Sequence, residues 1–226
     1  VIELYPELAP KAVERIRLLT RRGFYDGLLF HRVIAGFVAQ TGNPNNKDGG
    51  KSELPNLPLE ANQRVYPHNP DTRLRTSVYP AGTFDFGFIG ALPVVTVSTR
   101  GGPVTTGIYC TGVVGMGHDD ADDTANSELF IMLAPATRLN GKYTAVGRVL
   151  GGFDVVAGLP VGEPPAKPDS MKRVRVLADL PLAERPRIEL MDTRSSAFRD
   201  KAQVGASAEP LTYNACAVDV PVRTAP

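Results

Sequence analysis

Side chains that bind metals or carry redox chemistry are scarce in this chain of 226 residues. It contains two cysteines, three histidines and no tryptophan. Cys110 and Cys216 are far apart, without the short spacings typical of zinc or redox sites, so we expect no metal site. The histidines, His31, His68 and His118, leave few candidates for a hydrolytic serine-histidine-acid triad. The sequence thus argues against metal-dependent and triad-based hydrolysis.

The chain also lacks an excess of charge of either sign and has no long apolar run. The formal net charge is +1, which gives no reason to expect nucleic acid or a charged membrane surface as a partner. No apolar run is long enough for a transmembrane helix, so we expect no membrane insertion. No charged-then-apolar leader precedes the first expected strand, and the chain starts at Val1 without an initiator methionine. We expect that something upstream is missing or has been removed.

The two cysteines leave two interpretations open. Cys110 and Cys216 can form one disulfide that fastens the C-terminal region to the middle of the chain, or they can be two buried thiols. A disulfide would suit an oxidising compartment, whereas buried thiols would say nothing about location.

Prolines and glycines are abundant, 20 and 22 respectively, and indicate the many turns of a β-rich fold. Pro10 to Arg22 has apolar residues at helical spacing, a proline in the first turn and Gly23 after its end. Residues 152–159 predict a second, short helix. Asn140-Gly141 predicts a β-hairpin leading into the strand expected at 143–149. The expected strands are 1–5, 28–33, 37–41, 129–133, 143–149 and 174–177.

Two regions differ in composition and hydrophobic pattern from this core. Residues 62–112 contain scattered prolines and an apolar run from Phe84 to Val97. A structureless loop of this length is unusual in a compact domain, so we expect this region to form strands or turns that pack on the core. Residues 179–226 form an extension, with a helix expected near 195–204 and a final apolar segment at 216–222.

The segment Phe30 to Gly42, FHRVIAGFVAQTG, is the most informative part of the chain. It places Arg32, a permanent cation with a rigid fork of donors, among apolar strand residues. An isolated arginine there is most often a surface residue with a buried stem. The neighbouring amide of Gln40 and the motifs described next favour a functional arginine.

This segment resembles the signature of the cyclophilin-type peptidyl-prolyl cis/trans isomerases. The resemblance continues at Val1 to Tyr5, at Ala9 to Glu14, at Asn126 to Ile131 and at Leu139 to Val149. It implies a mainly β fold, a closed eight-stranded antiparallel barrel capped by two helices. Residues 1–178 would form this domain, with an insertion at about 62–112, and residues 179–226 an extension packed on or tethered to the barrel.

By the same resemblance, Arg32 would be the catalytic cation and Gln40 would position it and the substrate backbone. Phe37, Phe130 and Leu139 would line a proline pocket, with Gly117 and His118 along the bound peptide. Four positions depart from the best-known members. The substrate-binding candidates Val38, Glu128 and Tyr143 replace methionine, glutamine and histidine, and Arg138 replaces tryptophan. Taken singly, Phe130 and Leu139 are more often core residues and Gln40 a strand-edge amide.

The implied chemistry needs no cofactor. Rotation about an X-Pro bond has a barrier of about 18–20 kcal/mol, and a fixed donor beside an apolar pocket stabilises the twisted amide. We expect a peptidyl-prolyl isomerase that assists protein folding; the alternative is a cyclophilin-like binding module or chaperone for proline-containing segments. Glu128 bears on this choice, since an ion pair with Arg32 would either hold the guanidinium in place or occupy its donors.

The remaining expectations concern partners and location. We expect a monomer that acts on proline-containing unfolded or exported polypeptides. A disulfide between the two cysteines, together with the resemblance to bacterial members of the family that carry extensions, would favour the periplasm or secretion. The cytoplasm is the alternative.

Overall fold

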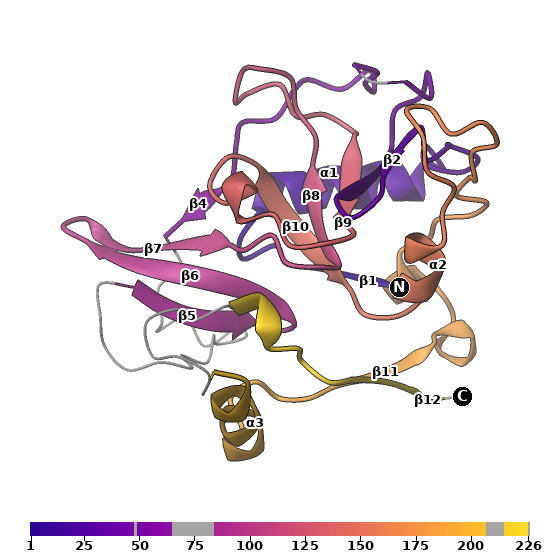
Figure 1. The fold of residues 1–226 in the computed structure, drawn as a ribbon. Coiled ribbons are helices and arrows are strands. Elements are labelled where there is room, and N and C mark those ends of the chain that lie inside the picture. Colours follow the sequence, from indigo (N-terminus) through magenta and orange to yellow (C-terminus); the bar gives the residue numbers. More distant parts are fainter. Residues whose placement is uncertain (48, 65–83, 207–214, 226) are drawn as a thin grey trace.

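In the computed structural model, a six-stranded antiparallel sheet forms the centre of the molecule (Figure 1). The residues described are 1–47, 49–64, 84–206 and 215–225, so His68 lies outside them. The strand order is β1-β10-β8-β9-β3-β2, and every neighbouring pair is antiparallel. The bounds are β1 (Ile2–Leu4), β2 (Arg32–Ile34), β3 (Val38–Thr41), β8 (Val113–Met116), β9 (Leu129–Met132) and β10 (Thr144–Val149).

Helix α1 (Pro10–Arg21) covers one side of this sheet (Figure 1). Its apolar residues recur at helical spacing and are buried, and they pack with strand residues in one hydrophobic cluster. Pro10 occupies the first turn, where its missing N–H costs nothing, and Gly23 ends the helix in the left-handed region at φ 69°. The predicted second helix is also present, as α2 (Phe153–Ala157).

The sheet has fewer strands than the eight expected. Within the described chain, residues 174–177 form no strand; instead Leu29 and Ser170, and Val33 and Gly162, pair as isolated bridges. Prolines at 160, 164, 165 and 168 limit strand pairing in the segment before these residues, because proline cannot donate to a strand ladder. The β-rich fold expected from the sequence is present, with irregular segments beside β2.

The hairpin predicted at Asn140-Gly141 is wrong. Strands β9 and β10 are not neighbours; β8 lies between them. Lys142 N–H donates to the Leu139 carbonyl at 3.0 Å, but Asn140 has φ −58° and only Gly141 has a positive φ, of 73°. A two-residue hairpin of the expected type needs positive φ at both positions. The turn instead follows a short 3-10 helix, Thr137–Leu139.

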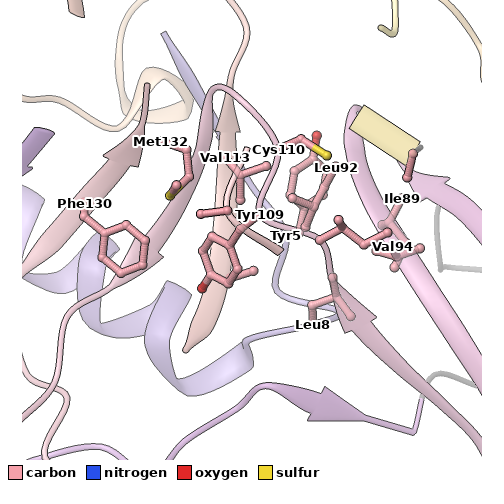
Figure 2. Close-up of a cluster of buried hydrophobic side chains, with 14 of the residues drawn as sticks. Tyr5, Leu8, Ile89, Leu92, Val94, Tyr109, Cys110, Val113, Phe130 and Met132 are labelled. Atoms are coloured by element: carbon pink, nitrogen blue, oxygen red, sulfur yellow. The ribbon is translucent and has the colours of Figure 1, made fainter. Parts of the chain in front are cut away.

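The insertion forms a sheet of its own beside the central one (Figure 1). Its order is β4-β7-β6-β5, with bounds β4 (Asn62–Gln63), β5 (Phe84–Ile89), β6 (Leu92–Thr99) and β7 (Gly102–Gly107). Ile89, Leu92 and Val94 share one buried cluster with Tyr5 and Phe130 (Figure 2). The insertion therefore packs on the central sheet through a common core.

The C-terminal extension packs on the insertion. It contains β11 (Arg187–Leu190), α3 (Ser196–Ala206) and β12 (Val222–Ala225), together with 3-10 turns at Leu177–Asp179, Leu182–Glu184 and Ala215–Ala217. Strands β11 and β12 pair with each other. Phe198 of α3 is fully buried and meets Phe88 edge to face at 5.3 Å. None of the helices in the described residues combines the length and apolar character needed to cross a membrane.

A disulfide joins Cys110 to Cys216, the first of the two interpretations that the sequence left open. The two residues are 106 positions apart in the chain. Because Cys110 shortly precedes β8 and Cys216 lies in the extension, the bond ties the extension to the centre of the molecule.

Candidate functional site

Arg32 and Gln40 lie directly opposite each other on the paired strands β2 and β3. Arg32 Nη1 donates to Gln40 Oε1, and Arg32 Nε donates to Glu163 Oε2 at 2.5 Å. The arginine side chain is 27% exposed, so its remaining donors can reach a ligand. Strand pairing thus fixes the guanidinium that the sequence predicts as the functional cation.

Glu128 lies on the far side of Gln40 from Arg32. Its Oε1 accepts a hydrogen bond from Gln40 Nε2 at 2.8 Å, and its Oε2 accepts one from Asn43 Nδ2. His31 Nε2 is 3.7 Å from Oε2. The direct Arg32–Glu128 ion pair considered from the sequence is not formed between these two described residues. The carboxylate that pairs with Arg32 is Glu163.

The carboxylate at 128 determines which way the Gln40 amide points. An ionised carboxylate only accepts hydrogen bonds, so the nitrogen of Gln40 turns toward Glu128 and its oxygen toward Arg32. Glu128 therefore acts on Arg32 indirectly, by presenting an acceptor to it through the amide.

A polar cavity of about 320 Å³ opens beside this network. Five predicted site residues line it, namely Arg32, Gln40, Gly117, His118 and Glu128. The other lining residues are Gly49, Gly50, Lys51, Asp119, Thr124, Asn126 and Glu163.

The Glu128 side chain occupies the space beside Gly117. The Gly117 N–H donates to the Glu128 carbonyl at 3.0 Å, and a Cβ at 117 would lie 2.1 Å from Glu128 Oε1. A larger residue would displace the carboxylate that orients Gln40.

The predicted apolar residues form the other half of the site. Val38 and Phe130 are buried in the central core, and Phe37, Leu139 and Tyr143 are partly buried against it. None of them lines the polar cavity. Tyr143 connects the halves, because its ring meets Phe130 edge to face at 5.5 Å and stacks on His118 at 4.4 Å.

Arg138 covers part of this apolar half. Its guanidinium carbon lies 4.4 Å from the centre of the Phe37 ring, a cation–π geometry. The residue that replaces the family's tryptophan thus still contacts the pocket wall, with a charge in place of an indole.

Tyr109 supports the apolar half from behind, and nothing in the sequence indicated it. Its ring is fully buried and stacks on Phe130 at 5.5 Å (Figure 2). Its backbone N–H donates to Asn140 Oδ1, and its carbonyl accepts from the Ala136 N–H at 2.8 Å. Burial raises the pKa of the Tyr109 hydroxyl well above its usual value. The insertion thereby braces the turn that carries Leu139.

Sequence reasoning also missed three polar residues. Glu163 lies in no motif identified in the sequence. It reaches Arg32 because the chain between α2 and the extension passes beside β2. Asn43 bonds Glu128 from the loop after β3. Asn126 lines the cavity while its Oδ1 accepts from the Ser52 N–H and hydroxyl. The available signal for Asn126 was its place in the quoted segment Asn126 to Ile131, and for Asn43 its place directly after the segment Phe30 to Gly42.

Comparison with protein families gives one match to most of the chain. Residues 1–177 match the family described as "Cyclophilin type peptidyl-prolyl cis-trans isomerase/CLD". The extension lies beyond this match.

Curated relatives match the same region. A probable peptidyl-prolyl cis-trans isomerase of Brucella suis is 32% identical over 172 residues, which cover 71% of this chain. The match spans 66% of that relative, just under two thirds of its length. Peptidyl-prolyl cis-trans isomerase B of Bacillus subtilis is 32% identical over 174 residues, covering 77% of this chain and 87% of the relative.

One solved structure matches nearly the whole chain. Cyclophilin AquaCyp293 from Hirschia baltica has a TM-score of 0.85 and 28% sequence identity, covering 99% of this chain and 85% of that one. The similarity therefore includes the insertion and the extension as well as the central sheet.

Proposed function

This chain belongs to the cyclophilin-type peptidyl-prolyl cis-trans isomerase family, and we propose that its Arg32 site catalyses the isomerisation of X-Pro bonds. The observation that carries the proposal is the pairing of β2 with β3. It places Arg32 opposite Gln40 at the edge of a polar cavity, and Phe130 of β9 lies across from the same Gln40.

The reaction needs electrostatic stabilisation rather than bond breaking. When the X-Pro amide twists, its resonance is lost and the prolyl nitrogen becomes pyramidal and basic. A donor fixed beside that nitrogen or the carbonyl stabilises the twisted state more than either planar isomer, which lowers the barrier. Arg32 is charged at every relevant pH and is held on two sides before substrate arrives, so it loses little freedom in the transition state.

Each neighbour has a separate role in this proposal. Gln40 holds the guanidinium and keeps an amide near the substrate backbone. Phe37, Phe130 and Leu139 receive the proline ring, Tyr143 closes one side, and Val38 leaves the wall shorter than methionine would. Gly117 and His118 run along the peptide. The polar cavity takes the backbone on the cation side.

The clients in this proposal are proline-containing unfolded or exported polypeptides, bound by a monomer in a folding-assistant or chaperone role. The Cys110–Cys216 disulfide supports a periplasmic or secreted location, because disulfides persist in oxidising compartments. A thiol titration of native and denatured protein without reductant checks that the bond is present.

The test of the function is the exchange rate of an Ala-Pro peptide measured by NMR. Wild-type protein accelerates cis/trans exchange, and Arg32→Ala reduces the acceleration by at least about tenfold, as loss of a preorganised donor does. Arg223→Ala is the matched control, since Arg223 pairs with Glu189 in the extension, away from the site. Peptide binding without any acceleration by wild type would contradict catalysis and favour the binding-module alternative.

A further inference from the structure

Glu163 contacts the catalytic cation from a segment outside the central sheet. It follows α2 in a proline-rich stretch, and its Oε2 accepts from Arg32 Nε at 2.5 Å. Both side chains line the same cavity. The neighbouring Gly162 is tied to β2 by two hydrogen bonds with Val33, one in each direction, at 2.8 and 2.9 Å. The carboxylate is therefore presented to Arg32 by a segment bonded to the strand that carries it.

Glu163 and Gln40 together hold the guanidinium in one orientation. A guanidinium has five N–H donors in a rigid plane. Within the described residues, Nε–H is bonded to Glu163 and one Nη1 hydrogen to Gln40, which leaves the second Nη1 hydrogen and both Nη2 hydrogens for a ligand. Two contacts on different nitrogens stop rotation of the plane, which one contact cannot do.

The same carboxylate adds charge to the cavity wall. Glu163 is 54% exposed, and only its Oε2 has a partner among the described residues, so Oε1 remains an acceptor. The charged lining residues are Arg32 and Lys51 against Asp119, Glu128 and Glu163. With Arg32 paired to Glu163, the wall accepts a donor or a cation from a peptide more readily than a second carboxylate.

We propose that Glu163 is a positioning residue for Arg32 and a specificity determinant that favours X-Pro substrates with a basic residue beside the proline over those with an acidic one. This inference rests on the proposed isomerase activity. The inference is drawn from three observations: the Arg32–Glu163 ion pair, the cavity that both side chains line, and the Glu163 Oε1 that has no partner among the described residues.

The experiment compares two peptides, Lys-Pro and Glu-Pro versions of one tetrapeptide, by NMR exchange at low and at physiological salt. Wild type isomerises Lys-Pro faster. Glu163→Gln keeps an acceptor for Arg32 Nε but removes the charge, so we expect the Lys-Pro preference at low salt to fall by about fivefold, the upper range for an exposed charge pair. The preference of wild type declines as salt screens it.

Three further variants separate positioning from charge. Glu163→Ala removes the acceptor as well as the charge, so it should slow the isomerisation of both peptides by about fivefold. Glu163→Gln should change only the ratio of the two rates, with no common slowing of both. Asp119→Asn removes one charge from the same cavity without touching Arg32, so it alters the preference but leaves the Arg32 orientation intact. Glu189→Gln, which breaks an equivalent exposed pair in the extension, should match wild type.

The Arg32 Nε–H signal in proton–nitrogen NMR spectra gives a readout besides activity. It should be slowed in exchange with water in wild type and in Glu163→Gln, and fast in Glu163→Ala. If wild type accelerates exchange but Glu163→Ala and Glu163→Gln behave like Glu189→Gln in both measurements, this inference is wrong and the isomerase activity stands. If wild type accelerates neither peptide, the proposed function itself fails.

Discussion

At the scale of single residues, the site depends on which atom of each polar group faces its neighbour. Glu128 differs from the family's usual glutamine by one atom, yet it fixes the Gln40 amide because a carboxylate cannot donate. Arg32 receives its counter-charge from Glu163, whose side chain is half exposed, so solvent weakens the attraction between the two charges.

Replacing Glu128 tests the cost of this arrangement. We expect Glu128→Gln to raise the rate of Ala-Pro isomerisation by about two- to threefold, because it removes a negative charge one amide away from Arg32, in a partly exposed site where charge interactions are weak. The amide introduced by this substitution can still accept from Gln40 through its own oxygen. NMR exchange rates of the two proteins give the measurement. An unchanged or lower rate would show that the acid is neutral, or that its bond to Asn43 matters more than its charge.

At the scale of elements, regular and irregular segments contribute differently. The β2–β3 hairpin places Arg32 opposite Gln40. Its turn contains Gly36, whose φ of 65° lies in the left-handed region. The segment after α2 is rich in prolines and forms no strand before β11; isolated bridges and side-chain hydrogen bonds hold it in place. Asp26, for example, accepts from the Val174 N–H at 2.7 Å and from the Arg175 guanidinium.

Asp26 makes the anchoring of this segment dependent on pH. The Val174 N–H and then the Arg175 guanidinium lower the pKa of Asp26 below its ordinary 3.8. A group with a lowered folded pKa stabilises the protein above its unfolded pKa, and the contribution is lost as pH falls through the folded pKa. We therefore expect Asp26→Asn to lower the melting temperature at pH 7, and the difference from wild type to shrink below pH 3.8.

Thermal unfolding between pH 7 and pH 3 measures this difference. Asp154→Asn, a change in the first turn of α2, is a control with no such anchoring pair in the described chain. A gap between wild type and Asp26→Asn that is constant over the whole range would contradict the assignment to the ionised carboxylate.

At the scale of the whole molecule, the insertion and extension support the site without lining its polar cavity. Cys110 joins the extension through its disulfide, and its neighbour Tyr109 stacks on Phe130 and bonds both ends of the 136–140 turn. Figure 1 shows the extension running along the insertion sheet toward the side of α2. A change in the extension therefore has a covalent and packed route to the proposed proline pocket around Phe130.

Removing the disulfide tests this route. The bond joins residues 106 positions apart, so we expect Cys216→Ser to lower the free energy of unfolding by about 2–4 kcal/mol. The isomerisation rate should also fall, because Tyr109 loses its adjacent anchor. Urea denaturation and Ala-Pro exchange measure the two effects, with Cys110→Ser/Cys216→Ser as the control for a free thiol. Full isomerisation activity in both variants would show that the disulfide contributes to stability but not to the site.

Much of the candidate site was predictable because family spacing survives along regular strands. Arg32 and Gln40 face each other in the β2–β3 register, Glu128 directly precedes β9, which pairs with β3, and Gly117 and His118 line the same cavity. The errors fall where a local pattern meets a tertiary constraint. Asn140-Gly141 forms a turn but not a hairpin, because β8 takes the place beside β10. Residues 174–177 form no strand; the Val174 N–H bonds the Asp26 carboxylate, and isolated bridges pair the preceding residues 162 and 170 with the chain at Val33 and Leu29.

Periodicity and motif alone predicted the β-rich family fold, the ends of α1 and Arg32 as the candidate functional cation, because these depend on short-range spacing and on the permanent charge of a guanidinium. Folding in three dimensions set the partner of Arg32, the support from Tyr109 and the choice of disulfide over free thiols. These depend on contacts between residues up to 131 positions apart, whose approach is decided by how the sheets and the extension pack. Thus Arg32 could be picked out as a candidate from the sequence, but the carboxylate that pairs with it, Glu163, could not.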